Sequence, residues 1–252
     1  MTERPTRIRI APAATEAPIG LSTLTVDLGA FLATAREIGF DPGLLLLTTR
    51  ALGVRSGGGM ALKDLRWVLG AEIGEILRWL TALEGSGLCV WQANGTTVTL
   101  EIASTETERT LFGPDDAPGV LHRLPTHWFV RMLPLVGRRA FLTYLYLRSR
   151  ERLSGLTAPL TIGMIARSSG QSPREAERSL RRLQQRGLSA SAGGHGRFVL
   201  TDPPPLSAFE RTYLRWLSAG AIPPTRGGRV RLLVWCVVPV AALALVLYAA
   251  LR

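Results

Sequence analysis

The chain has 252 residues, of which 46% are hydrophobic and 19% are charged, and its formal net charge is +11. This length and composition are typical of about two globular domains. The two cysteines, Cys89 and Cys236, provide no disulfide framework, which excludes a disulfide-stapled secreted scaffold and fits a reducing compartment.

The first segment, residues 1–26, contains no apolar stretch of the kind found in secretory signals, and we expect a disordered basic arm there. Charge is distributed unevenly along the rest of the chain. From Leu21 to Glu101, six basic residues face eight acidic ones, a net charge of −2. From His122 to Thr201, fourteen arginines face three glutamates, a net charge of +11. A genomic preference for arginine would affect both halves alike, so the basic half is expected to bind a polyanion.

The sequence repeats itself at a distance of about 100 residues. Residues 70–88 align without a gap with residues 170–188, and "LLLLTTR" (44–50) aligns with "YLYLRSR" (144–150). Upstream, "FLATAREIG" (31–39) corresponds to "FVRMLPLVG" (129–137) after a two-residue shift. Repeats of this kind indicate two copies of one structural unit. The positions that recur identically are Gly70, Glu75, Arg78, Leu80, Leu83, Gly87 and Leu88.

Each repeat predicts three helices followed by two short strands around a polar turn. The first helix is expected at about 43–54 and 138–153, and the second at about 61–69 and 160–168. The third helix ends at "SGL" or "RGL". The strands then read "CVWQANGTTVTLEI" in the first repeat and "SASAGGHGRFVLT" in the second, and each pair encloses a glycine-containing turn.

The segment "LTIGMIARSSGQSPREAERSLRRLQQRGLSASAGGHGRFVLT", Leu160 to Thr201, resembles the winged helix-turn-helix superfamily of DNA-binding proteins. The resemblance implies that Gln171–Leu188 contains the recognition helix. Two such domains in tandem are also loosely similar to plasmid replication initiators. We therefore expect a mainly α fold with small β-hairpin wings. It comprises two tandem winged helix-turn-helix domains, at 27–101 and 124–201, a linker at 102–123, and one C-terminal transmembrane helix.

The third helix of the second repeat separates an apolar face from a basic one. At 100° per residue, Ala176, Leu180 and Leu183 fall in one stripe, and the arginines lie opposite. Ser172, Pro173 and Glu175 predict a capping box, and the helix start could face a phosphate. A merely solvated face is the alternative. The candidate DNA-binding residues of this helix and the following hairpin are Ser172, Arg174, Arg178, Arg181, Arg182, Gln185, His195 and Arg197.

The matched helix of the first repeat serves as an internal control. Its apolar stripe is Ile76, Leu80 and Leu83, but the opposite face is small and nearly uncharged. Leu77 and Trp79 flank that face, and we expect them to contact the neighbouring domain, a second protomer or another protein. A purely solvated helix surface does not predict such a contrast between copies, which favours nucleic acid for the second repeat. The residues opposite the apolar stripe are Gly74, Arg78, Thr81 and Gly85.

The C-terminal region predicts a membrane anchor. A Pro- and Gly-containing linker at 202–230 holds a short amphipathic helix at 207–218, which is expected to lie on the membrane or on the last domain. Residues 231–252 form the tail anchor, because Leu232 to Leu251 are twenty consecutive apolar residues. Three arginines precede this span and only Arg252 follows it, which places the N-terminal domains in the cytoplasm. Residues expected at or within the bilayer are Trp235, Pro239 and Tyr248.

Motifs for catalysis are not found. The three histidines lack Cys or carboxylate partners at metal-ligand spacing, and "SGGGM" (56–60) lacks the lysine of a P-loop. We expect no enzyme activity, no cofactor and no metal.

The residues together predict a single-pass protein of the cytoplasmic membrane that binds double-stranded DNA and regulates transcription. A homodimer or a protein partner would use the first domain. The alternatives are a replication or segregation factor that holds DNA at the membrane, and a scaffold that binds proteins or anionic lipid.

Overall fold

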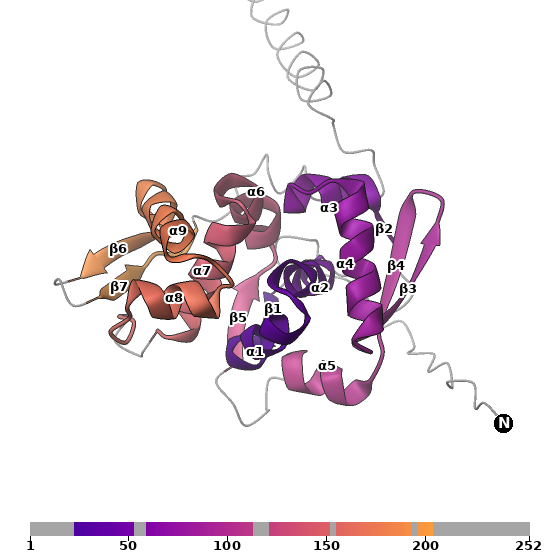
Figure 1. The fold of residues 1–252 in the computed structure, drawn as a ribbon, viewed down its shortest axis with the longest axis horizontal. Coiled ribbons are helices and arrows are strands. Elements are labelled where there is room, and N and C mark those ends of the chain that lie inside the picture. Colours follow the sequence, from indigo (N-terminus) through magenta and orange to yellow (C-terminus); the bar gives the residue numbers. More distant parts are fainter. Residues whose placement is uncertain (1–22, 53–58, 113–120, 152–154, 193–195, 204–252) are drawn as a thin grey trace, which may run out of the picture. The chain divides into compact units, whose positions relative to one another are not determined.

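The computed structural model describes residues 23–52, 59–112, 121–151, 155–192 and 196–203 (Figure 1). These residues belong to one compact unit, which is mainly helical with small antiparallel sheets, as the sequence predicts. Within them, no helix is long and apolar enough to cross a membrane. Outside them lie most of the arm, His195, nearly all of the C-terminal linker, and the tail anchor with Trp235, Pro239 and Tyr248.

The first repeat begins with a strand and two short helices, continues with two more helices and a hairpin, and is followed by an additional helix. Its elements are β1 (Thr23–Asp27), α1 (Leu28–Ile38), α2 (Phe40–Ala51), β2 (Gly59–Ala61), α3 (Leu62–Leu69), α4 (Ile73–Gly85), β3 (Cys89–Asn94), β4 (Thr97–Ile102) and α5 (Thr105–Phe112).

The second repeat follows the same order among the described residues, except that it has no strand in the place of β2, no helix in the place of α5, and one π-helical turn near its start. Its elements are β5 (Leu121–Pro125), η1 (Trp128–Met132), α6 (Leu133–Val136), α7 (Arg138–Ser149), α8 (Ile162–Ser168), α9 (Pro173–Gln185), β6 (Ser189–Ala192) and β7 (Arg197–Leu200). α3 and α8, α4 and α9, and the two hairpins all begin 100 residues apart, which confirms the internal repeat for these elements.

The alignment of 44–50 with 144–150 is wrong by two residues. α2 and α7 both have twelve residues and begin 98 positions apart, and their buried segments, 42–49 and 140–147, have the same spacing. The two-residue difference therefore falls in the connection that follows each helix. A nearly continuous buried run carries little periodicity, so the sequence pattern alone could not define the register of this helix.

A glycine divides the beginning of each repeat into two helices. Gly39 (φ 104°, ψ 139°) separates α1 from α2, and Gly137 (φ 81°, ψ 159°) separates α6 from α7. Residues that carry a Cβ rarely adopt these backbone angles, so glycine is required at both breaks. The two glycines lie 98 residues apart and belong to the repeat.

The expected linker 102–123 contains two elements that the sequence did not predict. α5 begins at a serine cap, where the Ser104 hydroxyl accepts a hydrogen bond from the backbone N–H of Thr107 at 3.0 Å. Glu108 in α5 forms an ion pair with Arg50 in α2. The strand β5 then pairs antiparallel with β1, so residues 23–26, which were expected to belong to a disordered arm, form part of a strand. Non-local pairing of two short strands leaves little local signal in the sequence.

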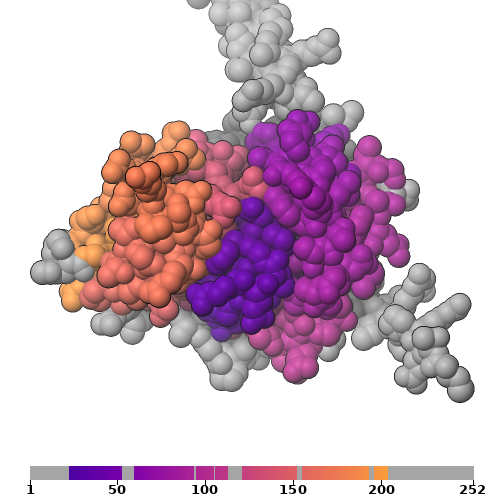
Figure 2. Space-filling model, viewed as in Figure 1, coloured from indigo at the N-terminus to yellow at the C-terminus, as the bar shows by residue number. Residues whose placement is uncertain are grey.

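The hydrophobic core includes the predicted stripes of both third helices. Ile76, Leu80 and Leu83 of α4 are buried, and so are Ala176, Leu180 and Leu183 of α9. α1 and α2 of the first repeat pack against α7 of the second, and Figure 2 shows these indigo helices against the orange second repeat. The two repeats therefore share an interface within the chain.

Candidate nucleic-acid interface

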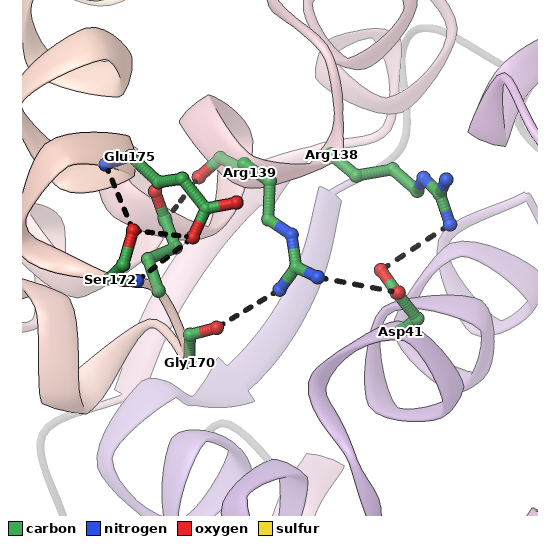
Figure 3. A network of polar contacts seen from close by, with 7 residues as sticks. Asp41, Arg138, Arg139, Gly170, Ser172 and Glu175 are labelled. Atoms are coloured by element: carbon green, nitrogen blue, oxygen red, sulfur yellow. Dashed lines mark hydrogen bonds and ion pairs between the residues drawn. The ribbon is translucent and has the colours of Figure 1, made fainter.

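The start of α9 has the predicted capping box. The Ser172 hydroxyl accepts a hydrogen bond from the Glu175 backbone N–H at 3.3 Å, and the Glu175 carboxylate accepts the Ser172 N–H and O–H, each at 2.9 Å (Figure 3). The Ser172 backbone N–H, and then its hydroxyl, hold the pKa of Glu175 below its ordinary value. The helix start thus carries its own carboxylate, which argues against a phosphate bound directly by the backbone N–H groups at this end.

The outer face of α9 is basic and open to solvent. Arg174, Arg178, Arg181 and Gln185 are all exposed, opposite the buried stripe, as the sequence predicts. Within the described part of the chain, none of the three arginines forms an ion pair. Their guanidinium groups are thus free to contact phosphates or the edges of guanines.

Arg182 has a structural contact that the helical pattern did not predict. Its Nη1 donates a hydrogen bond to the carbonyl oxygen of Val136 at 2.9 Å, at the end of α6. Arg182 therefore helps to hold α9 against α6, although sequence spacing placed it beside the DNA-binding residues. No local signal distinguishes it from Arg181, because its partner lies 46 residues away.

The β6–β7 hairpin follows α9 directly and contributes one more exposed arginine. Ala192 pairs with Arg197 at the turn end of the ladder, and Phe198 and Leu200 are buried in the core. The Gln184 side chain of α9 donates a hydrogen bond to the Ser191 hydroxyl in β6 at 3.1 Å, which ties the helix to the hairpin. Arg197 is exposed, as a residue that contacts DNA must be.

A buried polar cluster positions α9 against α7. The Gln171 Nε2 lies 2.8 Å from the carbonyl oxygen of Arg139, 2.8 Å from the Thr143 hydroxyl and 2.9 Å from the Ser169 hydroxyl. The Ser179 hydroxyl donates to the Gln171 Oε1 at 2.7 Å. Buried polar groups that are fully paired fix one geometry, because any displacement leaves donors and acceptors unsatisfied. Sequence reasoning missed this cluster.

The corresponding positions in the first repeat are apolar. Ala71 and Trp79 stand where the second repeat has Gln171 and Ser179. Leu69 replaces Ser169, and Leu45 stands at the position of Thr143 in the 98-residue register. The same backbone is thus held by apolar packing in one copy and by hydrogen bonds in the other.

Two arginines at the start of α7 connect the repeats (Figure 3). Arg139 donates a hydrogen bond to the carbonyl oxygen of Gly170 at 3.1 Å, and its Nη2 lies 3.9 Å from Asp41 Oδ2. The Nη1 of Arg138 lies 3.4 Å from Asp41 Oδ1. The Arg138 guanidinium also stacks on the Trp79 ring at 4.8 Å from its centroid.

Leu77 and Trp79, the expected partner interface, are both half-buried. For Trp79 the structure identifies a partner within the chain, because Arg138 belongs to the second repeat. This is one of the three possibilities that the sequence left open.

Within the described residues, no three His, Cys, Asp or Glu side chains come together to hold a metal ion. Cys89 is buried, and desolvation followed by the charge of Glu84 raises the pKa of its thiol to about 12. A thiol of this kind remains protonated at neutral pH and is a poor nucleophile. No protein-family model, no curated protein and no solved structure matches the chain.

Proposed function

We propose that this protein binds double-stranded DNA through the outer face of α9 and the β6–β7 hairpin. One observation carries the proposal: α9 presents Arg174, Arg178 and Arg181 to solvent without ion-pair partners among the described residues, whereas α4, at the same place in the first repeat, presents one arginine. Solvation alone requires no such difference between two copies of one unit. Binding to phosphates and base edges does require arginines on the copy that contacts DNA.

The order of elements supports a winged helix-turn-helix arrangement. α8 and α9 are joined by a tight turn at Ser169–Ser172, and the hairpin follows α9 after Gly187. In such an arrangement the second of the two helices enters the major groove, and the hairpin contacts the adjacent backbone. Arg178 and Arg181 in the middle of α9 are then suited to base edges, and Arg174 and Arg197 to phosphates.

We further propose that the protein regulates transcription from the cytoplasmic face of the membrane. The support is the twenty-residue apolar segment near the C-terminus and the arginines that precede it. Tethering would confine the protein to DNA near the bilayer and raise its effective concentration there. A replication or segregation factor at the membrane would use the same DNA-binding face.

The test is a titration of the full-length chain, in a neutral detergent, against a random-sequence duplex at several salt concentrations. On a random-sequence duplex no base is read, so we expect all four arginines (Arg174, Arg178, Arg181 and Arg197) to contact phosphates, and the logarithm of affinity falls with the logarithm of salt with a slope of about −3 to −4. The double variant Arg178→Ala with Arg181→Ala is expected to bind more weakly, with a slope smaller by about 2.

The matched control is Arg78→Ala, which removes the arginine at the same position of α4 and is expected to leave affinity unchanged. Equal affinities for the double variant and the parent chain would contradict the assignment of α9. Salt-dependent binding to vesicles that contain anionic lipid, with none to DNA, would show instead that the arginine face is a lipid-binding surface.

A further inference from the structure

The pairing of β1 with β5 relates the two repeats by an approximate two-fold axis. The strands occupy equivalent positions, 23–27 and 121–125, in the 98-residue register of the first helices. The two strands lie side by side (Figure 1) and pair antiparallel with Thr25 opposite Arg123, residues that are themselves 98 apart. In a two-fold dimer, a residue on the axis meets its own copy from the other subunit. Thr25 and Arg123 satisfy this condition within one chain.

The ion pair between Asp41 and Arg139 marks the same axis independently. These residues are also 98 apart, each being the second residue of its helix, α2 or α7. Their charged groups approach to 3.9 Å (Figure 3). Two pairs of equivalent residues therefore face each other, one in a sheet and one between helices.

Contacts beside the axis run from each repeat to the other, but they join different positions, since Gly70, the equivalent of Gly170, has nothing within 4 Å of an added Cβ. Phe40, the first residue of α2, lies against Gly170, so closely that a Cβ at that glycine would clash with its ring. Arg138, the first residue of α7 and the equivalent of Phe40, stacks on Trp79 in α4. Each repeat thus reaches the turn or third helix of the other, as in a two-fold arrangement that is approximate and not exact.

Only one of the two related third helices has a basic outer face. Gly74, Thr81 and Gly85 of α4 occupy the positions of Arg174, Arg181 and Gln185 in α9. The Thr81 hydroxyl donates to the carbonyl oxygen of Leu77 at 3.0 Å, within its own helix. Among the outer positions, Arg78 alone keeps the arginine of its counterpart.

We infer that the chain is a single-chain pseudo-dimer whose DNA target is a non-palindromic duplex, with bases read under α9 and none under α4. This inference rests on the proposed function. A symmetric dimer presents two identical helices, and its operator mirrors that symmetry as an inverted repeat. Here the second repeat occupies the surface of the first repeat that a second subunit would use in a dimer. One chain therefore binds one site. The part of the duplex under α4 carries no sequence requirement.

The experiment selects bound sequences from a randomised duplex library with the full-length chain in neutral detergent, and measures how many chains occupy one selected duplex. The expected result is a single contiguous block of specified base pairs, without an inverted copy, and one chain per duplex. Each mismatch inside the block is expected to weaken binding roughly 5- to 150-fold. Base changes to either side of it have less than about a twofold effect.

The matched variants are Arg178→Ala and Arg78→Ala, which remove equivalent arginines. The first is expected to erase the preference at one or two positions of the block, and the second to leave the selected sequence unchanged. An inverted repeat occupied by two chains would overturn this inference and leave the proposed function standing. Salt-dependent binding without any specified base pairs would do the same, whereas the absence of binding to any duplex would overturn the proposed function as well.

Discussion

α4 and α9 show how far two copies of one helix can diverge while their backbone stays the same. Both have thirteen residues, begin with a capping box, and bury an apolar stripe. Both are flanked by glycines with positive φ, at 70 and 87 in one copy and at 170 and 187 in the other. What differs is the opposite face and the packing that holds each helix in place.

The comparison separates the residues that define the fold from the residues that define a surface. Caps, glycines and apolar stripes recur because they satisfy backbone groups and remove apolar surface from water, which either copy needs in order to fold. The outer arginines of α9 contribute nothing of that kind. Two of them, Arg174 and Arg181, have no arginine counterpart on α4, and this difference is the basis of the proposal that they serve binding.

The largest effect on stability is expected when alanine replaces Gly170, the glycine that precedes α9. Gly70, which precedes α4, is the matched position in the first repeat. Gly170 (φ 63°) has the Phe40 ring against it, and Gly70 (φ 58°) has nothing within 4 Å. Gly170→Ala is expected to lower the free energy of unfolding by about 2–4 kcal/mol, because backbone strain adds to a steric clash. Gly70→Ala is expected to cost only about 1 kcal/mol. Chemical denaturation followed by tryptophan fluorescence measures both.

A Phe40→Ala background provides the control for that prediction. Removal of the ring opens the space beside Gly170, so the excess cost of Gly170→Ala should disappear in the double variant. Equal losses for Gly170→Ala and Gly70→Ala in the parent chain would show that the two repeats do not make this contact.

The second prediction concerns the buried polar cluster that only the second repeat contains. Gln171→Ala leaves the Ser179 hydroxyl without its acceptor and removes one donor from the Arg139 carbonyl oxygen, which keeps the Thr143 hydroxyl. The free energy of unfolding is expected to fall by about 1–3 kcal/mol, the usual cost of unsatisfied buried groups. Gln185→Ala, at an exposed position of the same helix, is the control and should change stability by less than about 0.5 kcal/mol. Similar values for the two variants would contradict a structural role for the cluster.

A small stabilisation is expected on α4, where the outer face carries no arginine at its first turn. Gly74 lies inside the helix, and no atom lies within 4 Å of the position that an alanine methyl group would take there. Gly74→Ala should raise the free energy of unfolding by about 0.5–1 kcal/mol, because alanine loses less backbone entropy than glycine. A decrease in the melting temperature would mean that this face is already covered.

The smallest effect is expected from the carboxylate at the start of α9. The pKa of Glu175 is lowered from 4.5 by hydrogen bonds from Ser172, so its contribution to stability is present above pH 4.5. That contribution is lost as the pH falls through the lower pKa of the folded state. The melting temperature of the parent chain should exceed that of Glu175→Gln at pH 7, and the difference should vanish in strong acid. A difference in melting temperature that stays the same at every pH would contradict the role of Glu175 in the cap.

Much of the local structure could be predicted from the sequence. Capping residues, turn glycines and the 100-residue spacing of similar patterns located the third helices and the hairpins, because these signals lie within a few residues of the structure they specify. The break at Gly39 and Gly137 was missed, since a glycine inside an apolar run does not show whether a helix bends or ends there. α5 and the β1–β5 pair were missed because a linker composition does not exclude short elements.

The exposed arginines of the candidate site could also be predicted, but not their separate roles. Arg181 and Arg182 are adjacent, identical in type and both exposed, yet Arg182 also donates a hydrogen bond to the carbonyl oxygen of Val136. Gln171 looked like an ordinary turn residue, and the partners that give it a role come from α7, 28 to 32 residues earlier.

The sequence by itself determined two copies of one unit, the amphipathic division of α4 and α9, and the accumulation of arginine on one of them. Helix periodicity and capping are local, and they act before the chain makes any distant contact. Only the tertiary structure decided that Thr25 meets Arg123, that Asp41 meets Arg139, and that Trp79 has its partner in the same chain. Those contacts depend on how two similar surfaces pack together, and such packing is specified by shape and charge across distances that no local pattern encodes.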